Sequence, residues 1–190
     1  KISILQGEAI YIRSMQTLRE VVTDFKQQHK ALGHFNFSDS NQLQAIAAAA
    51  KECKLPVVVG LSEGERDYFP ISNARALVDL YQSQGIQIYL NADHTYSIKK
   101  AKEAIDAGID SIVVDGAKLS LDDNISLVKA VCDLSRAQSR DVLVEGELGY
   151  IGTSSSVMDT LPEGVALTEE MMTKPEEAVA FVQQTSIDLF

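Results

Sequence analysis

Short apolar runs alternate with longer amphipathic stretches along almost the whole chain, and this alternation limits the possible folds more than any other feature. The pattern is typical of repeated strand–helix units. Strands are predicted at 31–38, 56–61, 86–92, 111–115, 141–148 and, for a last one, from Ile187 onward. Helices are predicted between them at 41–53, 72–84, 98–107, 124–137 and 175–184. Strands connected in this way are parallel, which leaves a doubly wound sheet or a closed barrel.

Two further features concern the kind of domain. No G-x-G-x-x-G sequence follows a predicted strand, which disfavours the dinucleotide-binding doubly wound fold. A helix predicted at 15–28 carries Leu18, Val21, Val22 and Phe25 on one face and would close the bottom of a barrel. The 190 residues, 45% of them hydrophobic, suit one domain. We therefore expect a single barrel-type domain over 1–190, with residues 1–29 as an N-terminal segment and helix before the first strand.

Composition excludes several classes of partner. A formal net charge of −10 leaves no basic excess for binding a nucleic-acid backbone, although local groups can still bind an anionic sugar phosphate. Cys53 and Cys132 are too few and too far apart to suggest a disulfide framework, which fits a reducing cytoplasm. The most apolar run, residues 45–50, is too short to cross a bilayer, so we expect no membrane association.

Polar residues gather where the predicted strands end. In a barrel these carboxyl ends share one rim, where active sites are built. Glu145 and Glu147 are two positions apart, so both leave the same face of their strand, where they would meet Asp93 and Asp115. Several carboxylates with a histidine suit a divalent cation. The residues in question are Asn36, Ser38, Ser62, Asp93, His94, Asp115, Glu145 and Glu147.

The motifs that hold these residues are similar to those of the class II, metal-dependent fructose-bisphosphate and tagatose-bisphosphate aldolases. Residues 90–95 read LNADHT, 104–108 AIDAG, 111–116 SIVVDG and 144–149 VEGELG. The family has D-H at its third strand, I-D-G at its fourth and E-x-E-L-G at its fifth. Residues 33–36 read GHFN where the family has G-A-F-N, and Ser62 after the second strand matches as well. The resemblance implies a (β/α)8 TIM barrel, of which this chain would hold about five to six units and lack the C-terminal part.

The resemblance also implies an activity and a role for each matching residue. The activity is the reversible cleavage of a ketose bisphosphate, fructose-1,6- or tagatose-1,6-bisphosphate, into dihydroxyacetone phosphate and glyceraldehyde 3-phosphate. Asp93 would be the catalytic acid/base, and His94, Asp115 and Glu147 would bind zinc or another divalent cation. Ser62 and Asn36 would line the substrate site. A cytoplasmic homo-oligomer, dimer or tetramer, is expected.

The sequence departs from the family pattern in two places. The family has three zinc-binding histidines, whereas this chain has His29, His34 and His94. Of these, we expect His29 to be exposed and His34 to be a hydrogen-bonded core residue, so the other two ligands would lie beyond Phe190 in a longer protein. After the fifth strand, a Ser-rich loop is expected at 149–168, and where the family has Gly-Gly followed by acidic residues this chain reads GTSSS at 152–156. Asp159 or Glu163 could approach the substrate if this loop closes, but neither is assigned the role of the missing loop acid.

Two alternatives to the aldolase remain open at the level of sequence. One is a different metal-assisted barrel lyase that uses magnesium on Asp115 and Glu147. The other is a catalytically incomplete paralogue or fragment that serves as a binding or assembly module.

Overall fold

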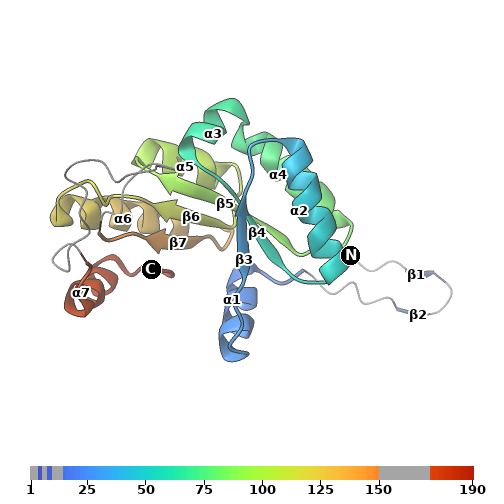
Figure 1. Cartoon of the computed structure of the whole chain (residues 1–190), viewed down its shortest axis with the longest axis horizontal. Helices are drawn as coiled ribbons and strands as arrows, with labels where there is room; N and C mark the ends of the chain where they lie inside the picture. Colours follow the sequence, from blue (N-terminus) through green and yellow to red (C-terminus); the bar gives the residue numbers. More distant parts are fainter. Residues whose placement is uncertain (1–3, 6–7, 10–14, 150–171) are drawn as a thin grey trace, which may run out of the picture.

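The computed structural model describes residues 4–5, 8–9, 15–149 and 172–190. Its elements alternate as the sequence predicts (Figure 1). The strands are β1 Ile4–Leu5, β2 Glu8–Ala9, β3 Gly33–Asn36, β4 Val57–Leu61, β5 Ile88–Thr95, β6 Ser111–Val114 and β7 Leu143–Gly146. The helices are α1 Leu18–Gln27, α2 Ser40–Cys53, α3 Glu63–Tyr68, α4 Ile71–Ser83, α5 Ile98–Asp106, α6 Leu121–Arg136 and α7 Pro175–Thr185.

Strands β3 to β7 form one parallel sheet in chain order, β3-β4-β5-β6-β7. Helices α2, α4, α5 and α6 lie along one side of this curved sheet, and its concave side faces away from them (Figure 1). Sequential order, parallel pairing and a single helical layer are the features of a (β/α)8 barrel rather than a doubly wound sheet. The predicted barrel class is thus confirmed for five strand–helix units. At the predicted sixth strand, Leu189 forms an isolated bridge with Glu145.

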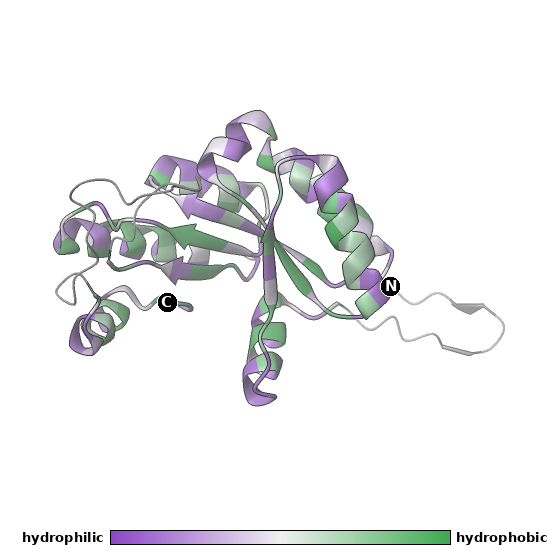
Figure 2. Cartoon of the chain, in the orientation of Figure 1, coloured by the Kyte–Doolittle hydropathy of each residue, from purple (hydrophilic) through white to green (hydrophobic). Residues whose placement is uncertain are grey.

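The core has two parts because each strand presents alternate residues to opposite faces. The larger part fills the space between the sheet and the helices with residues such as Val59, Leu90 and Ile112. Accordingly, Figure 2 shows apolar central strands and helices with apolar sides turned toward them. The smaller part lies on the concave side, where Leu18 and Val21 of α1 pack on strand residues. The prediction that this helix covers the bottom of the barrel is confirmed.

Local signals at the helix ends agree with the sequence. Thr17 and Glu20 form a capping box at the start of α1. Gly85 and Gly108 have φ angles of 83° and 86°, so they stop α4 and α5 in the left-handed conformation that glycine tolerates best. Both cysteines are free and lie in helices, as expected. Within the described ranges, no helix combines the length and the apolar character needed to cross a membrane.

Helix α3 was not predicted from the sequence. It follows β4 directly, contains six residues, and is N-capped by Ser62, whose hydroxyl accepts a hydrogen bond from the Glu65 amide. Three of its residues are acidic and it lacks an apolar periodicity, so the pattern that identifies longer helices is absent. The predicted loop at 149–168, with Asp159 and Glu163, lies outside the described residues beyond Gly149.

Candidate active site at the mouth of the sheet

The carboxyl ends of the strands, here called the mouth, collect polar side chains because of the strand alternation. Along β5 the concave side receives Tyr89, Asn91 and Asp93 in turn. Tyr89 packs against α1 at the bottom, and the Asn91 amide donates a 2.7 Å hydrogen bond to Ser111 Oγ one level higher. Asp93 occupies the next level. The same strand therefore changes from apolar to acidic between its first and last inward residues.

A bulge in β5 brings His94 to the same side as Asp93. In the pairing with β6, Ala92 lies opposite Ile112 and Thr95 lies opposite Val114. Two residues of β5, Asp93 and His94, therefore correspond to one residue of β6. His94 has a φ of 39°, in the left-handed region that non-glycine residues rarely adopt. Without this irregularity, His94 would alternate to the helix side of the sheet. The bulge is the local reason that two adjacent residues serve one site.

Three side chains from consecutive strand ends converge at the mouth. His94 Nδ1 lies 3.0 Å from Asp115 Oδ2 and 3.5 Å from Glu147 Oε2. One ligand atom from each of the three residues lies within 4.8 Å of the others. A nitrogen and two carboxylate oxygens are a donor set that zinc and other divalent cations accept. The described residues thus fit a divalent cation, although the set is one histidine and two acids rather than three histidines.

The electrostatics of this cluster favour a positive charge at its centre. Burial lowers the pKa of His94, but the hydrogen bond with Asp115 and the charges of Asp93, Glu147 and Asp115 outweigh it, so the pKa lies above its usual value. Burial, together with Asp115 and the other acids, raises the pKa of Glu147. Burial and the charge of Asp93 raise the pKa of Glu145 as well. These carboxylates repel one another until a cation lies between them.

Asp93 is held by the first strand of the sheet. Asn36 Nδ2 donates a 2.7 Å hydrogen bond to Asp93 Oδ2, while Asp93 Oδ1 lies 4.0 Å from His94 Nε2. Such a bond orients the carboxylate beside the candidate metal ligands. Ser62, the other predicted substrate residue, caps α3 at the end of β4. Its assignment as a substrate-binding residue, and that of Asn36, stay predictions.

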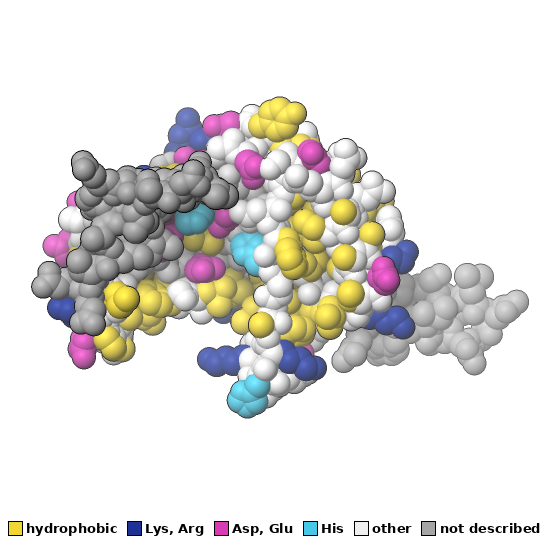
Figure 3. All heavy atoms as spheres, in the orientation of Figure 1, with side chains coloured by type: hydrophobic (Ala, Val, Ile, Leu, Met, Phe, Trp, Pro, Cys, Tyr) yellow, Lys and Arg dark blue, Asp and Glu magenta, His cyan; other side chains and the backbone are white. Residues whose placement is uncertain are grey.

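A cavity of about 370 Å³ opens beside this cluster. In the space-filling view, histidine and carboxylate side chains gather in a hollow near the middle of the face shown (Figure 3). Five of the residues that line the cavity are acidic or histidine, and the others are apolar or glycine. The lining residues are His34, Asp93, His94, Val113, Glu145, Gly146, Glu147, Leu148 and Phe190.

His34 corrects an expectation. It was predicted to be a core histidine, but the residue is exposed and lines the cavity with Asp93. A side chain at Gly60 would collide with it, since a Cβ there would overlap both His34 Nε2 and Asn36 Oδ1. The bare Gly60 backbone therefore makes room for both side chains. Strand alternation gave the correct face of His34, but not its exposure. His29 is exposed, as predicted.

Comparison with known proteins relates this chain to a family. The family described as "Fructose-bisphosphate aldolase class-II" matches residues 16–190. The fructose-bisphosphate aldolase of Treponema pallidum is 32% identical over 164 residues, and that of Geobacillus stearothermophilus 30% over 181 residues. These matches cover 83% and 92% of this chain, but 47% and 59% of the two relatives. The chain therefore spans about half to three fifths of their length.

Solved structures agree on the fold. The YdjI aldolase of Escherichia coli K12 superposes with a TM-score of 0.72 at 24% identity, over 91% of this chain and 59% of that one. A putative fructose-1,6-bisphosphate aldolase of Coccidioides immitis gives a TM-score of 0.69 at 26% identity, over 90% of this chain and 58% of that one. The first likeness supports the fold alone, because the identity is low.

Proposed function

Because the chain belongs to the class II fructose-bisphosphate aldolase family, we propose that the protein carrying it is a metal-dependent aldolase, a carbon–carbon lyase acting on a ketose bisphosphate. The products of cleavage would be dihydroxyacetone phosphate and glyceraldehyde 3-phosphate, from fructose-1,6- or tagatose-1,6-bisphosphate. The observation that carries the proposal is the convergence of Asp93 with the His94, Asp115 and Glu147 cluster at one mouth.

Asp93 is proposed to move the proton. Cleavage needs a base that takes a proton from the substrate hydroxyl as the carbon–carbon bond breaks, and an acid in the reverse direction. The Asp93 carboxylate faces the cavity and is oriented by Asn36, with His94 on its other side. A carboxylate fixed in this way can exchange a proton with a bound hydroxyl without first having to turn.

His94, Asp115 and Glu147 are proposed to hold zinc or another divalent cation. Bound there, the cation would act as a Lewis acid that polarises the substrate carbonyl and stabilises the negative charge left by cleavage. Two carboxylates offset the cation charge, and the raised pKa of His94 means that a proton competes with the metal for its nitrogen. The chain's own contribution is to keep these donors within one coordination shell.

The cavity is proposed to take the sugar-phosphate substrate. Asn36 and Ser62 would contact it, and His34, which stands where the family has alanine, adds an imidazole to the same space. The strongly acidic mouth is a poor site for phosphate groups by itself, so a bound cation is also needed to offset the local charge. It stays a prediction that the protein is cytoplasmic and homo-oligomeric and that it has no nucleic-acid or membrane partner.

A cleavage assay on the full-length protein tests the proposal. We expect fructose-1,6- or tagatose-1,6-bisphosphate to be split, the activity to vanish after exhaustive chelation, and zinc to restore it. Persistent cleavage in the metal-free protein would contradict the metal-dependent mechanism. Restoration by magnesium but not by zinc would favour a different metal-assisted lyase with oxygen ligands at Asp115 and Glu147.

A further inference from the structure

The bulge at Asp93 and His94 needs an external support. A left-handed conformation at His94 is less favourable than regular strand, and such residues persist only where their surroundings fix them. The β6 ladder supports His94 from one side only. Its pairing is interrupted between Ala92 and Thr95, and beyond the interruption the Thr95 carbonyl oxygen accepts a 3.0 Å hydrogen bond from the Asp115 amide. The groups that bind the backbone on either side of His94 therefore decide whether it stays at the mouth.

The Arg66 guanidinium occupies this position. It comes from α3 and is 8% exposed. Arg66 Nη1 donates to the carbonyl oxygens of Leu61, at 2.6 Å, and Asp93, at 2.9 Å. Arg66 Nη2 donates to Thr95 Oγ1 at 2.9 Å, and Thr95 is fully buried. One planar side chain thus binds the residue before His94 and the residue after it, and ties both to the end of β4.

Other residues of α3 complete the support. Glu63 Oε2 accepts a 3.0 Å hydrogen bond from the Tyr96 amide, just beyond the bulge, and lies 3.9 Å from Arg66. On the other side, Glu65 accepts a hydrogen bond from the hydroxyl of Ser38, which lies between β3 and α2. Helix α3 therefore connects the carboxyl ends of β3, β4 and β5. The short, acidic helix that the sequence pattern did not reveal is the element that braces the mouth.

The chemistry of Arg66 differs from that of the other buried arginine among the described residues. Arg75, 7% exposed, lies on α4 and pairs at 2.8 Å and 2.9 Å with the carboxylates of Asp79 and Asp110. Within the described part of the chain, the one ion-pair partner of Arg66 is Glu63, at 3.9 Å, and Arg66 directs its donors to neutral oxygens. Burying a charge with so little compensation is costly. A rigid fork that reaches three acceptors is what a guanidinium offers and lysine does not.

We propose that Arg66 is a positioning residue, whose bonds to the Asp93 carbonyl and the Thr95 hydroxyl hold Asp93 and His94 side by side in the geometry for catalysis and metal binding. The inference rests on the proposed function, since it takes His94 as a metal ligand and Asp93 as the acid/base. Arg66 touches neither the cavity nor the metal cluster and acts through the backbone of β5.

The test compares Arg66→Lys with Arg75→Lys in the full-length protein. Zinc affinity is measured by competition with a chromophoric chelator, next to kcat, KM and thermal unfolding of the metal-free forms. We expect Arg66→Lys to bind zinc about 10- to 100-fold more weakly, as when a group that orients a metal ligand is lost. At saturating zinc, kcat should fall while KM changes little, because Asp93 is misplaced. Arg75→Lys should lose stability and keep the wild-type zinc affinity.

A second variant covers the case in which Arg66→Lys does not fold. Glu63→Ala removes the acceptor for the Tyr96 amide from a partly exposed position, and it should weaken zinc binding in the same direction but less. Wild-type zinc affinity in the folded Arg66 or Glu63 variant would overturn the inference while leaving the aldolase proposal intact. Equal weakening in Arg75→Lys would overturn it too, by indicating general loosening. A wild-type protein that takes up no divalent cation overturns the proposed function together with this inference.

Discussion

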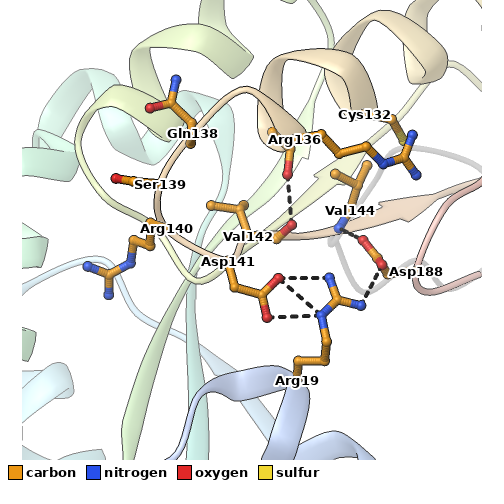
Figure 4. Close-up of a pocket in the computed structure, with 11 residues that line it drawn as sticks. Arg19, Cys132, Arg136, Gln138, Ser139, Arg140, Asp141, Val142, Val144 and Asp188 are labelled. Carbon is orange, nitrogen blue, oxygen red and sulfur yellow. Dashed lines mark hydrogen bonds and ion pairs between the residues drawn. The ribbon is translucent and has the colours of Figure 1, made fainter.

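Acidic side chains at the base of the sheet, where the strands begin, lie against arginines, whereas those at the mouth lie against one another. At the base, Arg19 binds Asp141 and Asp188 at 2.9 Å and 2.7 Å, as Figure 4 shows. Asp110 accepts hydrogen bonds there from Arg75 and Arg140 at 2.9 Å and 2.7 Å. At the mouth, the three acids Asp93, Asp115 and Glu147 lie around the single imidazole of His94.

The contrast separates stability from chemistry. Paired charges at the base tie α1, α4 and the strand starts together, and the apolar face of α1 covers the concave side there. The mouth keeps carboxylates whose pKa values are raised by burial and by one another, which is an unfavourable arrangement without a cation. In barrels the C-terminal rim carries function and the opposite rim carries stability. Substitutions at the two ends should therefore have separable effects.

The largest effect is expected for Asp93→Asn. The amide keeps an oxygen for the Asn36 bond but cannot take up the proton, so kcat should fall by about 10²- to 10⁴-fold. The temperature of thermal unfolding should stay near the wild-type value, because no buried ion pair is broken. Steady-state kinetics with zinc at saturation and calorimetry check both parts. Near-normal turnover would remove Asp93 from the proposed mechanism.

Asp110→Ala should have the opposite profile. Asp110 is 7% exposed and also accepts a 2.8 Å hydrogen bond from the Leu90 amide, so its loss removes the buried carboxylate partner of Arg75 and an acceptor of Arg140 and of that amide. Breaking such a buried pair costs about 3–5 kcal/mol. Urea unfolding of the metal-free protein measures the loss. If the free energy of zinc binding falls as much as the free energy of unfolding, the effects at the base and at the mouth of the sheet are not separable.

The smallest of the three effects is expected for Glu147→Gln. Zinc affinity should decrease at least about tenfold, since a charged donor at the cluster becomes neutral. Unlike Asp110→Ala, this change should not lower the unfolding temperature of the metal-free protein, because it removes a carboxylate whose pKa is already raised by burial and by Asp115. Glu52→Gln on the exposed side of α2 is a matched control for the loss of one negative charge. A destabilised Glu147→Gln would contradict the separation.

The sequence alone determined the strand–helix order, the parallel sheet, the role of α1 at the bottom and the residues that meet at the mouth. These follow from periodicities of two and 3.6 residues and from the shared direction of parallel strands, which are local properties of the chain. The tertiary structure decided the β5 bulge, the exposure of His34 and the brace formed by α3 through Arg66. Each of these depends on the register of a neighbouring strand or on which distant backbone atoms a side chain reaches, and no repeat in the sequence encodes such contacts.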